Sequence, residues 1–170
     1  MHRCSELDVD RLRPSGALLA TQLALSAAIE RCAVEGTGHD ATTMDLLVRL
    51  QLAPGHELRA VDLCDQLLKS PSHISRLLDR AEAAGLVSRQ PDPADRRASL
   101  VRLGDDGREV VSRFGPRLQS VLDQSIHDVL DDGDIEVLVD LLERIEVAAR
   151  SCSAGAAAGN SEAGGQSVGA

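Results

Sequence analysis

A run of polar and basic side chains between residues 69 and 80 has the chemistry to bind a nucleic acid. It comprises Lys69, Ser72, His73, Ser75, Arg76 and Arg80. Hydroxyl, imidazole and guanidinium groups can hydrogen-bond to base edges, and ammonium and guanidinium groups pair with phosphates. We therefore expect the two serines, His73 and Arg76 to reach bases, and Lys69 and Arg80 to meet phosphates. The same pattern is also typical of a helix face that is simply solvated.

Ser70 and Pro71 predict the start of the helix that carries these side chains. Serine accepts a backbone N–H bond at the N-cap, and proline at the first helical position loses no donor that the helix needs. Apolar residues then recur at helical spacing, namely Ile74, Leu77, Leu78 and Ala81. This spacing predicts a buried face opposite the polar one. Gly85 predicts that the helix ends near Ala84.

Two short strands are predicted after this helix, over residues 86–90 and 99–103. The Pro-Asp-Pro-Ala-Asp-Arg-Arg segment between them suits a turn, so the strands should form a hairpin. Arg96 and Arg97 lie near its tip and could enter the minor groove of DNA. A short helix over 57–68 is predicted before the helix that begins at Ser70 and Pro71. Two helices joined by a tight turn and followed by a hairpin are the order typical of a winged helix-turn-helix.

Further helices are predicted on both sides of this segment, over residues 12–32, 42–52, 106–130 and 135–149. The predicted fold class is therefore mainly α with a small β-hairpin wing. We divide the chain into an N-terminal arm and dimerisation helix (1–36), a winged helix-turn-helix domain (37–103), C-terminal dimerisation helices (104–150) and a tail (151–170). The tail is mostly Gly, Ala and Ser, which bury too little apolar surface to offset ordering, so we predict that it is disordered.

The run from Leu63 to Arg89, followed by Asp92 to Leu103, resembles the recognition helix and wing of MarR-family regulators. The resemblance covers about residues 12–150. It implies a sequence-specific transcriptional regulator. More specifically, it implies a ligand-responsive repressor that binds an inverted repeat of double-stranded DNA as a homodimer. The family's wing carries an Asp-x-Arg signature, matched here by Asp95 and Arg97. By this resemblance Arg97 reaches DNA and Asp95 helps to position it.

The sequence departs from the family in two places. Leu103-Gly104 stands where the family usually has Leu-Thr, which removes a side-chain N-cap that Asp105 or Asp106 could replace. Phe114 is the single aromatic residue, whereas pockets for phenolic effectors in this family often use ring contacts. The resemblance therefore implies a small-molecule effector without indicating which one.

The charge of the chain is unevenly distributed. Its formal net charge is -9, but residues 69–103 hold seven basic and four acidic residues, which leaves a net charge of +3 there and -12 elsewhere. A basic segment within an otherwise acidic protein is compatible with DNA binding, because affinity for DNA comes largely from Lys and Arg. The near absence of aromatic side chains argues against single-strand and RNA binding modules, which stack bases on rings.

The cysteines and histidines predict neither a disulfide framework nor a metal site. Cys4, Cys32, Cys64 and Cys152 lie far apart, and the histidines show no paired ligand spacing. A reducing cytoplasm is the simplest setting. A redox-sensing regulator stays open as an alternative, since a dimer would bring Cys4 and Cys152 towards each other. Cys32 and Cys64 lie on apolar helical faces and are expected in the core.

Other functional classes have less support in the sequence. No catalytic constellation or phosphate loop appears, so we predict that the protein is not an enzyme and needs no cofactor. A winged-helix protein-interaction module without DNA binding stays an alternative, and the net acidity favours it. We expect no membrane partner, because Thr21 and Gln22 interrupt the N-terminal apolar run and no stretch approaches about 20 apolar residues.

Overall fold

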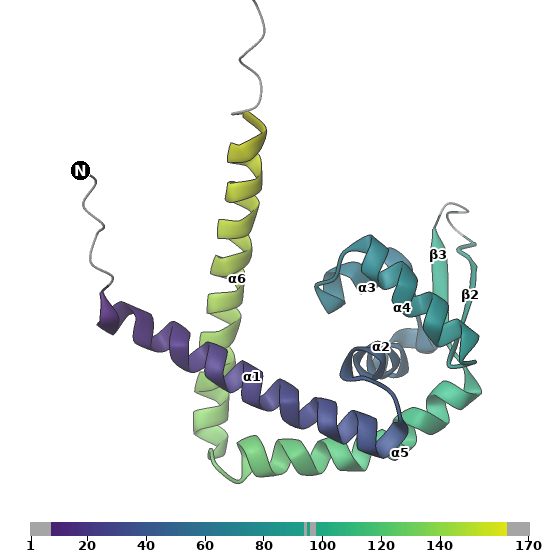
Figure 1. Ribbon diagram of the computed structural model, residues 1–170, viewed down its shortest axis with the longest axis horizontal. Helices are drawn as coiled ribbons and strands as arrows, with labels where there is room; N and C mark the ends of the chain where they lie inside the picture. The colour runs from purple at the N-terminus through teal and green to yellow at the C-terminus, as the bar shows by residue number, and fades with distance from the viewer. Residues whose placement is uncertain (1–7, 94, 96–97, 163–170) are drawn as a thin grey trace, which may run out of the picture. The chain divides into compact units, whose positions relative to one another are not determined.

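The computed structural model describes residues 8–93, 95 and 98–162. The chain divides into two compact units, residues 1–123 and 124–170, and each is described by itself. The first unit contains α1 (Val9–Thr37), α2 (Ala41–Leu52), the short 3-10 helix η1 (Pro54–His56), β1 (Glu57–Arg59), α3 (Ala60–Leu67), α4 (Pro71–Ala83), β2 (Val87–Pro91), β3 (Ser99–Leu103) and α5 (Asp105–Leu122). This arrangement confirms the predicted fold class (Figure 1).

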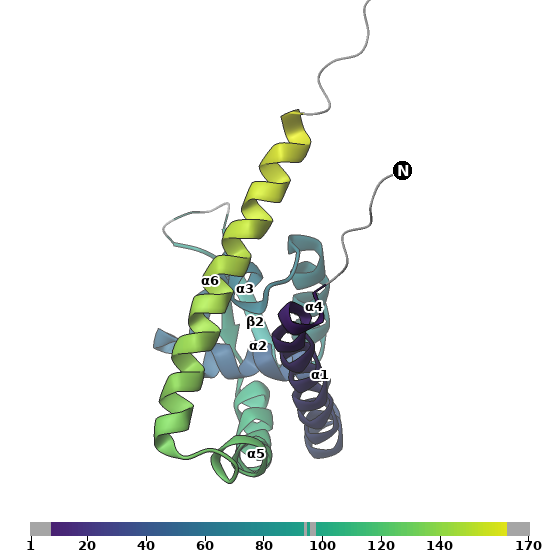
Figure 2. The ribbon, with the colours of Figure 1, turned by 90° about the vertical axis from the view of Figure 1, so that its left-hand side faces the viewer.

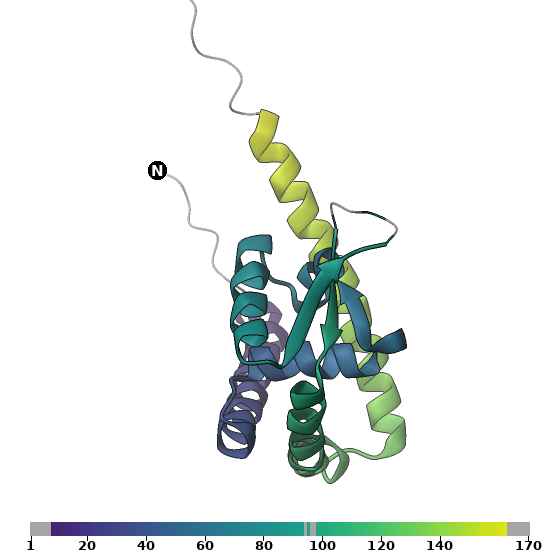
Figure 3. The same cartoon turned by 90° about the vertical axis from the view of Figure 1, so that its right-hand side faces the viewer.

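The strands form a small antiparallel sheet in the order β1-β3-β2. In the hairpin, Val87 pairs with Leu103 and Pro91 with Ser99, so β2 and β3 match residue for residue. The hairpin packs against α2, α3 and α4 (Figure 3). The sequence missed β1 and predicted helix from residue 57, because a three-residue strand has too few positions to show alternation and its partner β3 lies far along the chain.

One hydrophobic core holds the first unit together. It draws on every helix from α1 to α5 and on the hairpin, with Leu46, Leu47, Leu63, Leu77, Val101 and Phe114 among its most buried side chains. Cys32 is part of this core and Cys64 packs against it, as the sequence predicted. The core fixes α4 and the hairpin relative to each other, so the residues expected to meet DNA have a rigid support.

The long helix α1 packs against α5 and α2 through its C-terminal half (Figures 1 and 2). Ala33 is buried there, but Leu19 and Leu23, nearer its start, are 63% and 66% exposed. By length and composition alone, residues 12–37 are apolar enough to cross a membrane, with a mean hydropathy of 1.3 in the most apolar window. Counting uninterrupted apolar residues had missed this property. One such helix is weak evidence for a membrane span, because core helices of soluble proteins and signal sequences pass the same test, and only 11% of this window is buried.

The second unit consists of a π-helical turn, η2 (Asp123–His127), which straddles the division, and the long helix α6 (Asp132–Glu162). Asp131 begins α6 by accepting a hydrogen bond from the Asp134 N–H at 2.9 Å. The prediction of a disordered tail from residue 151 is wrong for residues 151–162, which are helical. Alanine has the highest helix propensity of all residues, so the alanines of this segment extend a helix that is already formed.

Candidate nucleic-acid interface

The recognition helix α4 begins where Ser70 and Pro71 predicted. The Ser70 Oγ accepts a hydrogen bond from the His73 N–H at 3.3 Å, and Pro71 occupies the first turn. Helix α3 ends just before, at Leu68, which adopts a left-handed backbone with φ of 52°. The Lys69 N–H then donates to the Cys64 carbonyl at 3.1 Å, which closes the turn. The two helices are thus joined by a tight turn with both ends capped.

Helix α4 has one buried apolar face and one exposed polar face. Ile74, Leu77, Leu78 and Ala81 are buried, as their spacing predicted. The polar residues predicted to read DNA lie together on the other side, where Ser72, Ser75, Arg76 and Arg80 are exposed and His73 is partly exposed. His73, Arg76, Asp79 and Arg80 line an open hollow of about 510 Å³. The structure therefore brings the predicted α4 residues onto one accessible surface.

Arg76 is an exposed cation on this surface. Its Nε donates to the Ser72 carbonyl at 3.3 Å, a contact within its own helix, and its side chain is exposed. Arg80, by contrast, lies 3.7 Å from the Asp40 carboxylate at the start of α2. An exposed ion pair of this length contributes little to stability and leaves the guanidinium free to exchange partners.

Arg89 of β2 neutralises the acidic residues of α4, a role that the sequence did not reveal. Its Nε lies 2.9 Å from the Glu82 carboxylate, and its Nη2 contacts Asp79. Its backbone N–H also donates to the Glu82 carboxylate at 3.1 Å. The hydrogen bond to Asp79 raises the pKa of Arg89; burial opposes this rise and Glu82 adds to it. Because both carboxylates are paired, they repel an approaching phosphate less than bare carboxylates would.

The base of the wing is well defined. The Asp92 N–H donates to the Ala98 carbonyl at 3.1 Å, and the Ala98 N–H donates to the Asp95 carbonyl at 2.8 Å. Asp95 is exposed. Arg96 and Arg97, which the sequence assigns to DNA, lie outside the described residues. Their contacts, and the positioning of Arg97 by Asp95, stay predictions.

Position 104, directly after the wing, suits a glycine because the backbone there lies against that of residues 85 and 86. Its N–H donates to the Leu86 carbonyl at 2.8 Å. A Cβ at this position would lie 2.8 Å from the Gly85 carbonyl oxygen and 3.1 Å from that of Leu86. A side chain would therefore require the backbone to shift. Helix α5 begins without a side-chain cap, and Asp105 in its first turn supplies negative charge there, as the sequence suggested.

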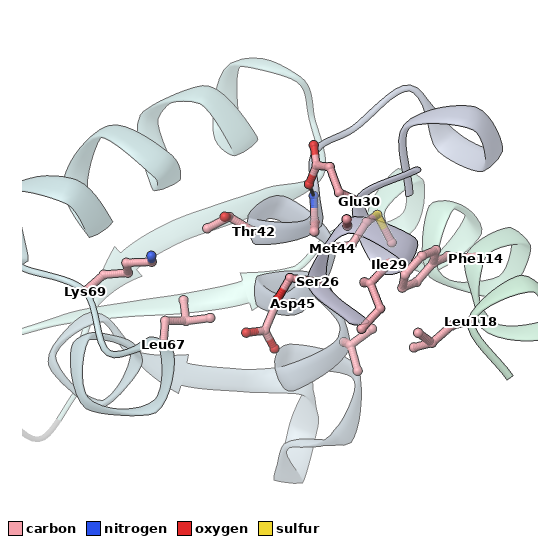
Figure 4. A pocket seen from close by; sticks show the side chains of 13 residues that line it. Ser26, Ile29, Glu30, Thr42, Met44, Asp45, Leu67, Lys69, Phe114 and Leu118 are labelled. Carbon is pink, nitrogen blue, oxygen red and sulfur yellow. Dashed lines mark hydrogen bonds between the residues drawn. The ribbon is translucent and has the colours of Figure 1, made fainter. Parts of the chain in front are cut away.

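A cavity of about 730 Å³ lies between α1, α2 and α5, next to the turn that precedes α4. Ile29, Phe114 and Leu118 gather at one end of it and Lys69 lies at the other (Figure 4). Two acidic residues also line it, but both have partners. Glu30 accepts the Ala41 N–H at 2.8 Å, and Asp45 pairs with Arg49. Sequence reasoning placed Lys69 on phosphates and did not predict that it also lines this cavity.

Comparison with known proteins gives one family match and a consistent fold. Residues 37–98 match the model described as the MarR family. Among curated proteins, no sequence matches this chain. The recognition of MarR-type helix and wing residues is therefore confirmed for the segment that carries them.

Solved structures with the same fold include three bacterial regulators. Sco3205, a MarR family transcriptional regulator from Streptomyces coelicolor solved in complex with DNA, is 23% identical with a TM-score of 0.78, over 84% of this chain and 89% of that one. The PcaV transcriptional regulator from the same organism is 26% identical with a TM-score of 0.61, over 81% and 98%. BpsR of Bordetella bronchiseptica, whose DNA binding is regulated by 6-hydroxynicotinic acid, is 20% identical with a TM-score of 0.67, over 86% and 96%.

Proposed function

Since residues 37–98 are a winged helix of the MarR family, we propose that this protein is a cytoplasmic transcriptional regulator that binds double-stranded DNA sequence-specifically. The observation that carries the proposal is the exposed polar face of α4, which is backed by a buried apolar face. A major groove about 12 Å wide admits one such helix. Ser72, His73, Ser75 and Arg76 then face base edges, while Lys69 and Arg80 meet phosphates.

Selection of bound fragments from random or genomic DNA by the full chain tests this proposal. We expect one enriched inverted repeat, with affinity that falls steeply as salt rises, by about 0.9 logarithmic units per neutralised phosphate. Replacing Arg97 with Ala should weaken binding to all sequences. If no sequence is enriched, or if binding is insensitive to salt, the chain acts instead as a protein-interaction module.

We further propose that the protein acts as a homodimer. Apolar side chains are exposed on both long terminal helices, including Leu19 and Leu23 of α1 and Leu141, Leu142 and Ile145 of α6. Large exposed apolar surfaces mark contact with another molecule. A two-fold dimer would place two recognition helices about 34 Å apart, one turn of DNA, which matches an inverted repeat.

The cavity beside the turn is the proposed site of a small-molecule effector that releases DNA. It has an apolar end formed around Phe114 and a cation at Lys69, so it suits a small organic acid. BpsR, which shares the fold, responds to an acid of this kind. Because Lys69 adjoins the N-cap of α4, a ligand that holds Lys69 in the cavity removes it from the DNA surface. Because the acid and DNA compete for Lys69, binding of the acid relieves repression.

Binding of 6-hydroxynicotinic acid, with its neutral amide as the matched control, tests the effector site. We expect the acid to bind the free protein more tightly than the DNA complex, because coupling between two ligands is reciprocal. Replacing Lys69 with Met should abolish the difference between acid and amide. Equal binding of the two compounds to the unaltered protein would contradict the assignment.

A further inference from the structure

Asp92 is a charged side chain in a position where charge is costly. It is 4% exposed, and apart from Thr43 it is the only buried polar residue in the described part of the chain. Burial of a carboxylate costs free energy unless an opposite charge or hydrogen bonds compensate. An apolar residue would fill the same space without that cost, so the carboxylate is best explained by a partner that it holds in place.

Arg59 forms an ion pair with Asp92. The Arg59 Nε lies 2.6 Å from the Asp92 Oδ2. Arg59 is the last residue of β1 and occupies the N-cap position of α3, the first helix of the helix-turn-helix. Asp92 immediately follows β2 and begins the loop of the wing. The ion pair therefore joins the start of the helix-turn-helix to the start of the wing loop.

The same residue also closes the base of the loop. Pro91 and Ser99 form the last pair of the hairpin, and beyond them the Asp92 N–H donates to the Ala98 carbonyl at 3.1 Å. Asp92 is thus held by its backbone across the loop and by its side chain to Arg59. Two attachments in different directions hold Asp92 in place at the end of β2.

A second ion pair on β1 shows what is specific to this one. Arg102 of β3 lies 2.6 Å from Glu57, at the other end of the same three-residue strand. Its carboxylate, Glu57, is 29% exposed against 5% for Asp92, while the two arginines are similarly exposed, at 53% and 45%. It joins two strands that are already hydrogen-bonded, whereas Arg59 and Asp92 join the N-cap of α3 to the residue that follows β2.

We propose that Arg59 and Asp92 are positioning residues for DNA binding, and that their ion pair fixes the wing loop relative to the helix-turn-helix without contacting bases. This inference rests on the proposed function. With the pair intact, the wing meets the DNA that flanks the α4 site without a further cost of ordering. Without it, α4 still reads its groove, but the wing must be ordered on binding, and affinity falls only where flanking DNA is present.

The test compares two duplexes of the sequence selected by the wild-type chain, one with its flanks and one trimmed to the segment that α4 reads. Wild type, Asp92→Asn, Arg59→Met and Arg59→Lys are measured on both, with Glu57→Gln as the matched control. We expect the flanks to strengthen wild-type binding about tenfold, and Asp92→Asn and Arg59→Met to lose that gain while binding the trimmed duplex normally. Arg59→Lys keeps a charge at this position and should recover part of the gain, and Glu57→Gln should keep all of it.

Three results would overturn the inference while leaving the proposed function intact. If Asp92→Asn keeps the full gain, the pair does not position the wing. Equal weakening on both duplexes would show that the pair only stabilises the fold, and urea unfolding of each variant would reveal the same loss. A decrease for Arg59→Met alone, with a salt slope shallower by about 0.9 on the trimmed duplex, would show that Arg59 contacts a phosphate itself. If the wild-type chain selects no duplex, the proposed function fails first and this inference with it.

Discussion

In the winged-helix region, residues 37–103, most large apolar side chains of α2, α3 and α4 are buried, with Leu52 and Val61 as exposed exceptions, whereas those of α6 are exposed or only partly buried. Leu46, Leu63 and Leu77 are fully buried, but Leu142 and Ile145 are 41% and 48% exposed. Among the described side chains of α6, residues 132–151, none is buried. The winged helix therefore completes its core within one chain, and α6 has apolar surface left over for a partner.

The largest effect is expected in the core of the winged helix. Replacing Leu77 with Ala removes a fully buried side chain of α4 and should lower the free energy of unfolding by about 2–5 kcal/mol. Chemical denaturation monitored by circular dichroism measures the change. Val147→Ala in α6, where the side chain is 67% exposed, is the control and should cost far less. Equal losses would mean that the two regions do not differ in the way that their burial indicates.

In α6, we expect a substitution to weaken self-association rather than folding. A glutamate in place of Leu142 should leave the fold of the winged helix intact but weaken self-association by about 2 kcal/mol or more, as at an interface hot spot. Sedimentation equilibrium measures the dimerisation constant. Arg144→Glu adds the same carboxylate at a position 71% exposed and paired with Asp140, and it serves as the control. A dimer of unchanged stability in Leu142→Glu would show that another surface joins the subunits.

The sequence predicted local features of the fold better than features that depend on distant contacts. The start of α4 was predictable because Ser70 and Pro71 act on their own helix. The strand β1 was not, since it exists only by pairing with β3. The end of α6 was misplaced because composition suggested disorder, although alanine favours helix.

The candidate site shows the same division. The polar face of α4 could be predicted, because helical periodicity alone separates it from Ile74 and Leu77. The contacts of Arg89 with α4 and of Arg59 with Asp92 could not, since each joins segments that only the folded chain brings together. The residues missed are therefore those that position the surface rather than those that form it.

A moderate effect is expected on the exposed surface of α4. Replacing Arg76 with Ala should relax base preference at one position in each half-site by about 1–3 kcal/mol, because Arg bonded to guanine is a strong discriminating contact. Arg76 lies outside the core, so the free energy of unfolding should change little. Selection of DNA by the variant and by Arg144→Ala, which removes the same charge from α6, separates base reading from general attraction. The assignment fails if both variants select the same sequence with equal stringency.

The smallest effect is expected at the start of α2, where Asp40 caps the helix. Its Oδ1 accepts the Thr43 N–H at 2.7 Å. Partial burial works to raise the pKa of Asp40, but hydrogen bonds from Thr43 and the charges of Arg80 and His39 outweigh it and hold that pKa below its ordinary value. Asp131 accepts a similar bond from the Asp134 N–H in α6, so the two caps can be compared directly.

Replacing Asp40 with Ala should lower the free energy of unfolding by about 1 kcal/mol near pH 7, while Asp40→Asn, which keeps the cap, should cost only a few tenths. Because the pKa of Asp40 is lower in the folded state, its negative charge stabilises the fold above about pH 4. This contribution to the free energy of unfolding is lost as the pH falls through the folded-state pKa. In urea unfolding from pH 7 to pH 2, the wild type should therefore approach Asp40→Asn in acid, while Asp40→Ala stays less stable because it lacks the capping oxygen at every pH. Asp131→Ala should shift the same transition less, since α6 buries no described side chain. A larger shift for Asp131→Ala than for Asp40→Ala would mean that α6, and not the winged helix, limits the stability of the chain.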